Sequence, residues 1–105
     1  MPSQQSIDRF TLAFHRRAVA RLREQTALRR QALEVLDRWE LQGASVSGRA
    51  YRDQWRLLLS GEPDVLEREV CAATDRAATL RSVSPLGFVL SPEERLELRQ
   101  GAMAE

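Results

Sequence analysis

The chain has 105 residues, 16 arginines, no lysine, 15 acidic residues and a formal net charge of +1, which fits one small domain of balanced charge. It contains no run of 18 apolar residues and does not begin with a charged segment followed by an apolar one. We therefore expect neither a membrane span nor a secretory signal, and a cytoplasmic protein. The single cysteine, Cys71, excludes an internal disulfide framework and a multi-cysteine zinc site, and no cofactor-binding motif occurs.

Residues 4–42 are predicted to form one long helix. The stretch from Ser3 to Gln42 contains no Gly or Pro and is rich in residues that favour helix. Ser3 or Ser6 suits the N-cap, and Gly43 suits the C-terminal stop. One broad face is expected to be buried, because its apolar residues recur close to the helical period: Ile7, Phe10, Phe14, Ala18, Leu22, Leu28, Ala32, Val35, Leu36 and Trp39.

Two shorter helices are predicted after a loop at 42–48. The first covers 49–59, where apolar residues recur at helical spacing: Tyr51, Trp55, Leu58 and Leu59. Ser60 and Gly61 end it, and Pro63 suits the first position of a helix over 63–81. This helix carries a packing seam with small residues in the middle: Leu66, Val70, Ala73, Ala77 and Leu80.

The C-terminal part is predicted to contain an apolar loop and a short last helix. Pro85 and Gly87 interrupt the apolar segment at 82–90, which we expect to lie on the helices as a loop or an extended strip. Ser91, Pro92 and Glu94 predict a capping box and a helix over 92–100. The expected fold is all-α: a three- or four-helix bundle that forms a single domain over 1–105.

The length of the first helix is a problem for a small domain. A helix of about 36 residues spans about 54 Å, whereas a domain of 100 residues has a radius of gyration of about 13 Å. The helix must therefore overhang and be covered by a partner or a second copy, or it must break near residues 23–30 and fold back as a hairpin. The sequence leaves both alternatives open.

His15 and Cys71 are the only candidate reactive side chains of the usual kinds. His15 lies at the edge of the apolar face beside Arg16 and Arg17, and we expect it to be a surface residue. Cys71 lies next to the seam of the third helix and is expected to be a small core residue. We predict no catalytic residue, no metal site, no cofactor and no enzyme activity.

Arginines dominate the first helix. Between Arg9 and Arg30 there are seven arginines and one acid, whereas residues 42–105 hold ten acids and eight arginines. Arg9, Arg16, Arg23 and Arg30 are seven residues apart and would form a row on a straight helix, opposite its apolar face. Such a row can meet backbone phosphates, so nucleic-acid binding is the alternative function. The low net charge and the absence of a known nucleic-acid-binding motif disfavour it.

The remaining arginines of this helix and the aromatic residues are candidates for a protein interface. Arg17, Arg21 and Arg29 lie near the apolar face and must reach solvent or pair with acids. Candidate acidic partners occur in the third helix and just before it: Glu62, Asp64, Glu67 and Glu69. Four aromatic residues belong either to the core or to a recognition groove: Trp39, Tyr51, Trp55 and Phe88.

Residues 55–95 resemble small bacterial helical proteins of the antitoxin or accessory-partner kind. The resemblance is carried by Trp55, Leu58, Leu59, Leu80, Arg81, Ser84, Pro85, Leu86, Val89, Leu90, Ser91, Pro92, Glu93, Glu94 and Arg95. It implies a non-enzymatic protein that binds and restrains a partner, with the segment 86–90 at or near the interface.

The leading hypothesis is a protein-binding module, antitoxin-like or regulatory, that occludes a partner protein. A second copy is one form of this partner, and no membrane partner is expected. The predicted partner-binding residues are Phe14, Arg17, Arg21, Leu22, Arg29, Trp39, Tyr51, Trp55 and Phe88.

Overall fold

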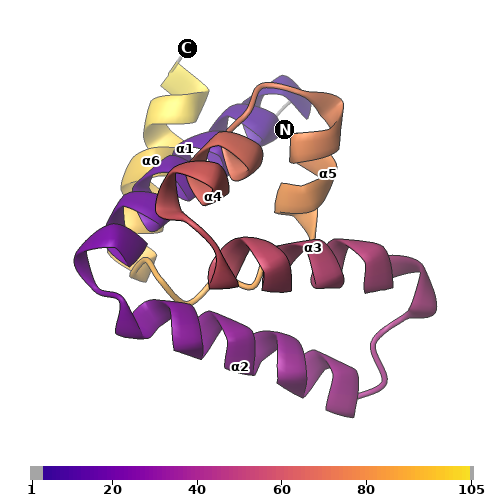
Figure 1. Ribbon diagram of the computed structural model, residues 1–105. Coiled ribbons are helices and arrows are strands. Elements are labelled where there is room, and N and C mark those ends of the chain that lie inside the picture. Colours follow the sequence, from indigo (N-terminus) through magenta and orange to yellow (C-terminus); the bar gives the residue numbers. More distant parts are fainter. Residues whose placement is uncertain (1–3, 105) are drawn as a thin grey trace.

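The computed structural model describes residues 4–104, and this part of the chain is all-helical, as expected, with no strand (Figure 1). It contains more helices than the three or four that were predicted. In chain order they are α1 (Gln4–Glu24), α2 (Ala27–Leu41), the short 3-10 helix η1 (Val46–Gly48), α3 (Arg49–Ser60), α4 (Pro63–Val70), α5 (Asp75–Ser82) and α6 (Pro92–Ala104).

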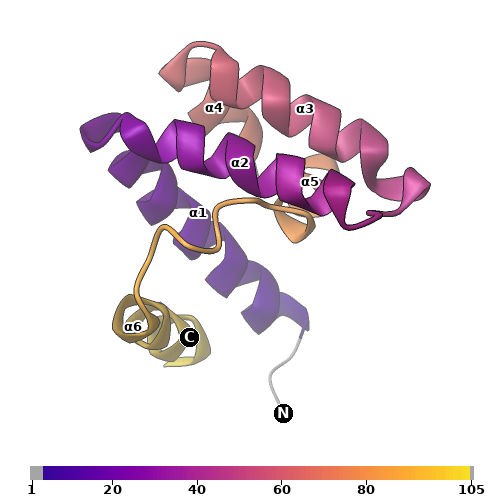
Figure 2. The same ribbon diagram turned by 90° about the horizontal axis from the view of Figure 1, so that it is seen from below.

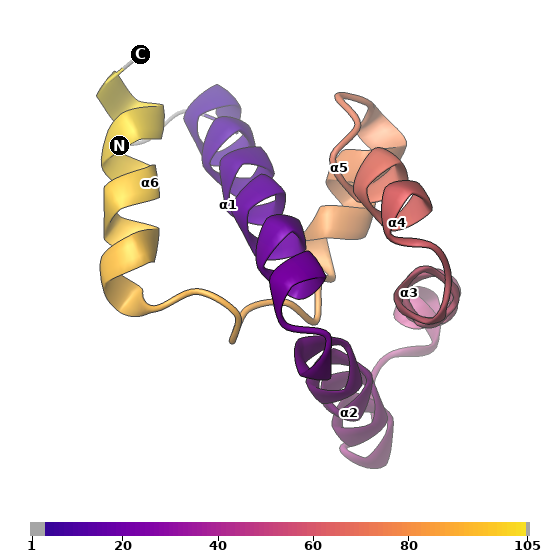
Figure 3. The same cartoon turned by 60° about the vertical axis from the view of Figure 1, so that its left-hand side comes forward.

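The prediction of one long helix over 4–42 is wrong, because the helix is interrupted at Gln25 and Thr26. Residues 23–27 are all exposed, so no buried side chain holds the helix straight at this point. The longest dimension of the described part is 37 Å, which is too short for a helix of about 54 Å. The break lies where a hairpin was considered, yet no tight hairpin results. Instead α1 packs mainly on α6, α5 and α4, and α2 packs mainly on α3 (Figure 3).

The predicted helix over 63–81 is also divided in two. It stops after Val70, and Thr74 caps the new helix α5 by accepting a hydrogen bond from the Ala77 N–H at 3.1 Å. Arg81 stabilises the turn between α4 and α5, because its guanidinium donates to the carbonyl oxygens of Val70 and Ala72 at 2.7 and 2.8 Å. Ala73 was predicted to belong to the packing seam, but it lies in this turn and is exposed.

Several predicted helix ends are confirmed. Gly43 follows α2 with a φ of 79°, a conformation that favours glycine. The capping box has both of its bonds, since the Ser91 N–H donates to Glu94 and the Glu94 N–H donates to the Ser91 hydroxyl, each at 3.2 Å. Other ends differ. The last helix runs through Gly101 to Ala104, Ser6 lies inside α1 rather than at its cap, and Ser3 lies outside the described residues.

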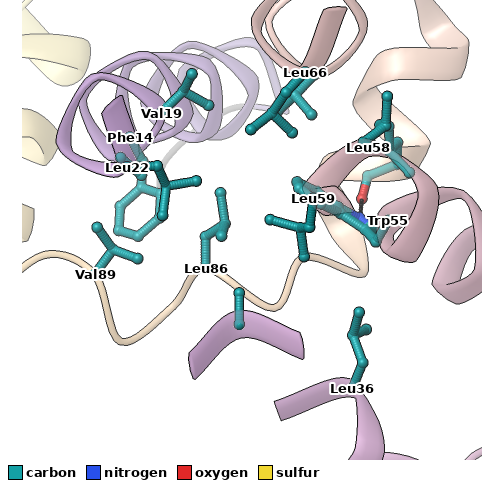
Figure 4. Close-up of a cluster of buried hydrophobic side chains, with 14 of the residues drawn as sticks. Phe14, Val19, Leu22, Leu36, Trp55, Leu58, Leu59, Leu66, Leu86 and Val89 are labelled. Atoms are coloured by element: carbon teal, nitrogen blue, oxygen red, sulfur yellow. Dashed lines mark hydrogen bonds between the residues drawn. The ribbon is translucent and has the colours of Figure 1, made fainter. Parts of the chain in front are cut away.

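The core lies between α1, α2, α3, α4 and the loop that joins α5 to α6, and Leu80 of α5 also belongs to it. Trp55 of α3 is fully buried, and its indole N–H donates to the Leu80 carbonyl oxygen at 2.9 Å. The loop crosses the molecule beside α2, as Figure 2 shows. As predicted, it lies on the helices as an apolar strip, with Leu86 and Val89 pointing toward Phe14 and Leu22 of α1 (Figure 4).

Replacing Ser91 by Ala is expected to lower the free energy of unfolding by about 1 kcal/mol, because the first turn of α6 loses its capping hydroxyl. Urea denaturation followed by circular dichroism measures this change. Ser60→Ala is the matched control, since this exposed hydroxyl has no hydrogen bond within residues 4–104. Equal losses in the two variants would show that the capping box adds nothing.

Candidate protein-binding site

Three of the predicted partner-binding residues belong to the core instead. Phe14, Leu22 and Trp55 are all at least 95% buried inside the single chain. Most of the apolar face of α1 is covered by other parts of the same chain, whereas Ile7, which was also predicted to be buried, is 45% exposed. These residues are therefore corrected from interface to core, and an Asp at Phe14 or Leu22 would disrupt folding rather than assembly.

Arg17, Arg21 and Arg29 have partners within the chain, but these are not the predicted acids of residues 62–69. Arg21 pairs with Glu94 of α6 at 2.7 Å. Arg17 lies 4.0 Å from Glu97. Arg29 donates to the carbonyl oxygens of Leu59 and Gly61 near the end of α3. All three arginines hold helices together, so none of them is freely available to a partner.

The contacts of α6 with α1 are largely those of arginines. Besides the pairs with Arg17 and Arg21, Arg95 and Arg99 of α6 lie over the rings of Phe14 and Phe10, each at 5.0 Å. Arg21 and the Ser91 N–H lower the pKa of Glu94, because both stabilise its carboxylate. Of the α6 side chains that the structure describes, only Ala102 is fully buried, so this helix depends on polar contacts more than on the core.

The predicted row of four arginines does not form. The interruption of the helix at Gln25 and Thr26 places Arg30 on α2, whereas the other three arginines lie on α1. Arg23 pairs with Asp64 and Glu67 of α4 at 2.6 and 2.7 Å, and Arg9 donates to the Ala102 carbonyl oxygen at 3.2 Å. Arg16 is exposed on α1. Since acids or a carbonyl oxygen already occupy two members, no row of phosphate-binding groups runs along one helix.

His15 is buried, which corrects the expectation of a surface residue. Only 3% of it is exposed, and Nδ1 lies 2.7 Å from the Thr11 carbonyl oxygen. Because a carbonyl only accepts, the ring proton sits on Nδ1, and the buried Nε2 has no hydrogen-bond partner within residues 4–104. Burial lowers the pKa of His15 to about 4, so the ring is neutral at pH 7.

Cys71 is half-buried and packs against the core, as predicted. Burial raises the pKa of its thiol, which keeps it protonated at neutral pH and makes it a poor nucleophile. Within residues 4–104 no three His, Cys, Asp or Glu side chains gather in a way that could hold a metal ion. None of the helices in this part is both long and apolar enough to cross a bilayer.

Phe88, the most exposed of the predicted interface aromatics, lines an open groove along α2. The groove has a volume of about 760 Å³. Its remaining walls come from α2, through Gln31, Glu34, Val35, Asp37, Arg38 and Leu41. Two large apolar side chains are exposed in it, Leu41 at 87% and Phe88 at 41%.

The charged groups of this groove differ in how they are held. Asp37 pairs with Arg56 of α3 at 2.7 Å, which helps to fix α2 against α3. Glu34 and Arg38 are exposed and form no hydrogen bond or ion pair through their side chains within residues 4–104. The groove therefore offers apolar contacts, one free carboxylate and one free guanidinium.

The other two predicted aromatics lie elsewhere. Trp39 is partly buried against the core. Tyr51 lines a second groove of about 480 Å³, whose walls come from α3, α4, α5 and the turn between α4 and α5. The aromatic residues therefore do not form one recognition site.

Six groove residues were missing from the predicted site: Asp37 and, on the outer face of α2, Gln31, Glu34, Val35, Arg38 and Leu41. The spacing of the latter five follows one face of α2, and Leu41 is a large apolar residue directly before the helix stop at Gly43. This spacing is visible in the sequence, yet only the position of Phe88 beside it identifies the face as a groove.

The buried His15 should make folding sensitive to acid. The unfolded chain binds a proton at His15 near pH 6.5, whereas the folded chain binds it only near pH 4. His15 therefore leaves stability unchanged above about pH 6.5, and about 3 kcal/mol are lost as the pH falls from 6.5 to 4.

Urea unfolding of the wild type and of His15→Leu at pH 7, 5.5 and 4.5 measures this loss. The variant is expected to lose less stability than the wild type over this range, because carboxylate titration is common to both proteins. Parallel pH profiles would contradict the buried neutral state of His15.

Comparison of the chain with protein-family models, with curated proteins and with solved structures found no match.

Proposed function

We propose that this chain is a non-enzymatic protein-binding module whose docking site is the groove along α2. The observation that carries the proposal is the exposure of Leu41 and Phe88 in one groove, beside the partly buried Val35. Large apolar side chains that converge on a groove are typical of sites that receive a helix or peptide of another protein.

The rest of the molecule supports this choice of surface. Most of the apolar face of α1 is already buried, and most arginines of α1 are engaged with α4 and α6. The side of α2 next to the groove is held to α3 by the pair of Asp37 and Arg56, and Ala32 and Leu36 anchor α2 in the core. A rigid surface binds with a smaller entropic cost than one that must first become ordered.

The proposed mechanism is occlusion of a partner by a regulatory or antitoxin-like subunit. The resemblance to such proteins implies that the segment 86–90 lies at the interface. Within this segment Leu86, Val89 and Leu90 belong to the core, while Phe88 is exposed in the groove. Phe88 is therefore the side chain through which this loop would contact the partner.

Leu41→Asp and Phe88→Asp test the proposal. A tagged form of the chain is used to isolate a bound protein from cells that produce the chain and its partner. The complex is then rebuilt from the two purified proteins. Each variant is expected to weaken binding at least about tenfold, because a carboxylate replaces an apolar contact in the groove. Isothermal titration calorimetry measures the dissociation constants.

Leu57→Asp is the matched control, since Leu57 is 71% exposed on α3 and does not line this groove. It is expected to bind as the wild type does. If Leu41→Asp and Phe88→Asp also bind normally, the groove is not the docking site. Isolation of nucleic acid, with an affinity that falls steeply with salt, would replace the proposal by the alternative function.

A further inference from the structure

The outer face of α2 carries a short stripe that is largely exposed. Gln31, Glu34, Val35, Arg38 and Leu41 all line the groove and share one face of the helix. From Gln31 to Leu41 the stripe is about 15 Å long. Its two charged members, Glu34 and Arg38, are exposed and have no ion-pair partner within residues 4–104.

The charges of this stripe are complementary to those of a second, antiparallel copy. Glu34 and Arg38 lie two residues on either side of Leu36. An antiparallel copy of α2, related by a two-fold axis at the level of Leu36, places each Glu34 beside Arg38 of the second copy. One such arrangement forms two identical ion pairs, as a two-fold interface requires. A parallel copy in register would place like charges side by side instead.

We propose that the groove along α2 is occupied by a second copy of this chain, through antiparallel pairing of the two α2 helices. The proposal rests on the proposed function and names the partner of that same docking site. Val35 lies one residue from the axis, so the two Val35 side chains come together at the centre. Leu41 of each copy lies over the Gln31 end of the other groove, where its exposed side chain becomes covered.

The charges decide between a second copy and an unrelated apolar segment. An apolar segment would offer no charged partner to Glu34 or Arg38, so these two residues would add nothing to its recognition. A second copy supplies an arginine for each glutamate and a glutamate for each arginine. The groups also suit each other, because the guanidinium fork matches the two oxygens of a carboxylate.

The contact is expected to be weak and dependent on concentration. Stable dimers bury about 800 Å² on each partner, and one face of a 15-residue helix with Phe88 beside it provides less. Sedimentation velocity of the full chain, from about 5 to about 500 µM, covers the range in which such an interface dissociates. The expected mass rises from 12.0 kDa toward twice this value.

Charge reversal tests the arrangement. Glu34→Arg alone and Arg38→Glu alone each bring like charges together across the axis, so each variant is expected to remain monomeric. A mixture of the two variants should associate, because one copy then carries two arginines and the other carries two glutamates. The double variant E34R/R38E should associate with itself as the wild type does. Circular dichroism and urea unfolding confirm that each variant is folded.

Leu57→Asp serves as the surface control and is expected to associate normally. A wild-type chain that stays at 12.0 kDa at every concentration overturns the second-copy proposal. Association that survives both single charge reversals also overturns it, because another surface must then form the dimer. Neither result overturns the proposed function, because a groove that does not pair with a second copy remains open to a different protein, and the effect of Leu41→Asp on binding of such a protein decides that question separately.

Discussion

All the apolar faces of this chain must reach one small core, and this requirement determines where the helices break. Buried residues from α1, α2, α3, α4 and the loop before α6 form a single cluster around Trp55 and Leu86. A straight helix over 4–42 would carry Ala32 and Leu36 away from Leu22 and leave them uncovered. Interrupting the helix at Gln25 and Thr26 removes a few helical hydrogen bonds, but it allows the apolar residues on both sides to be buried.

The uneven charge distribution along the chain is explained largely by contacts within it. The arginine-rich helix α1 lies between α4 and α6, which supply acidic partners for Arg21 and Arg23. The Glu94 carboxylate makes two of these contacts, because it completes the capping box and also pairs with Arg21. Two of the arginines that suggested a surface for nucleic acid, Arg9 and Arg23, thus hold helices of the same chain together.

The face of α2 beside Phe88 differs from the rest of this surface. Leu41 is almost fully exposed there, and Glu34 and Arg38 have no partner within residues 4–104, whereas Asp37 on the neighbouring side is paired with Arg56. Exposed apolar side chains also occur elsewhere, such as Val46 and Leu57, but Leu41 and Phe88 line the same groove. This contrast is the physical basis for placing the docking site on α2 and for asking whether a second copy fills it.

The sequence by itself determined the local features of this protein. These are its all-helical class, the stop at Gly43, the capping box at Ser91 and Glu94, and the apolar strip before α6, because neighbouring residues alone produce them. The N-cap of α5 at Thr74 was equally local but was overlooked. Only the tertiary structure decided the rest. The sequence placed a possible break near residues 23–30, where no large apolar residue stands between Leu22 and Leu28, but it could not decide between a break and a long helix covered by a partner. The burial of His15 and Phe14, the pairing of Arg21 with Glu94, and the meeting of Phe88 with Leu41 join residues far apart in the chain, and they depend on how the helices share one core.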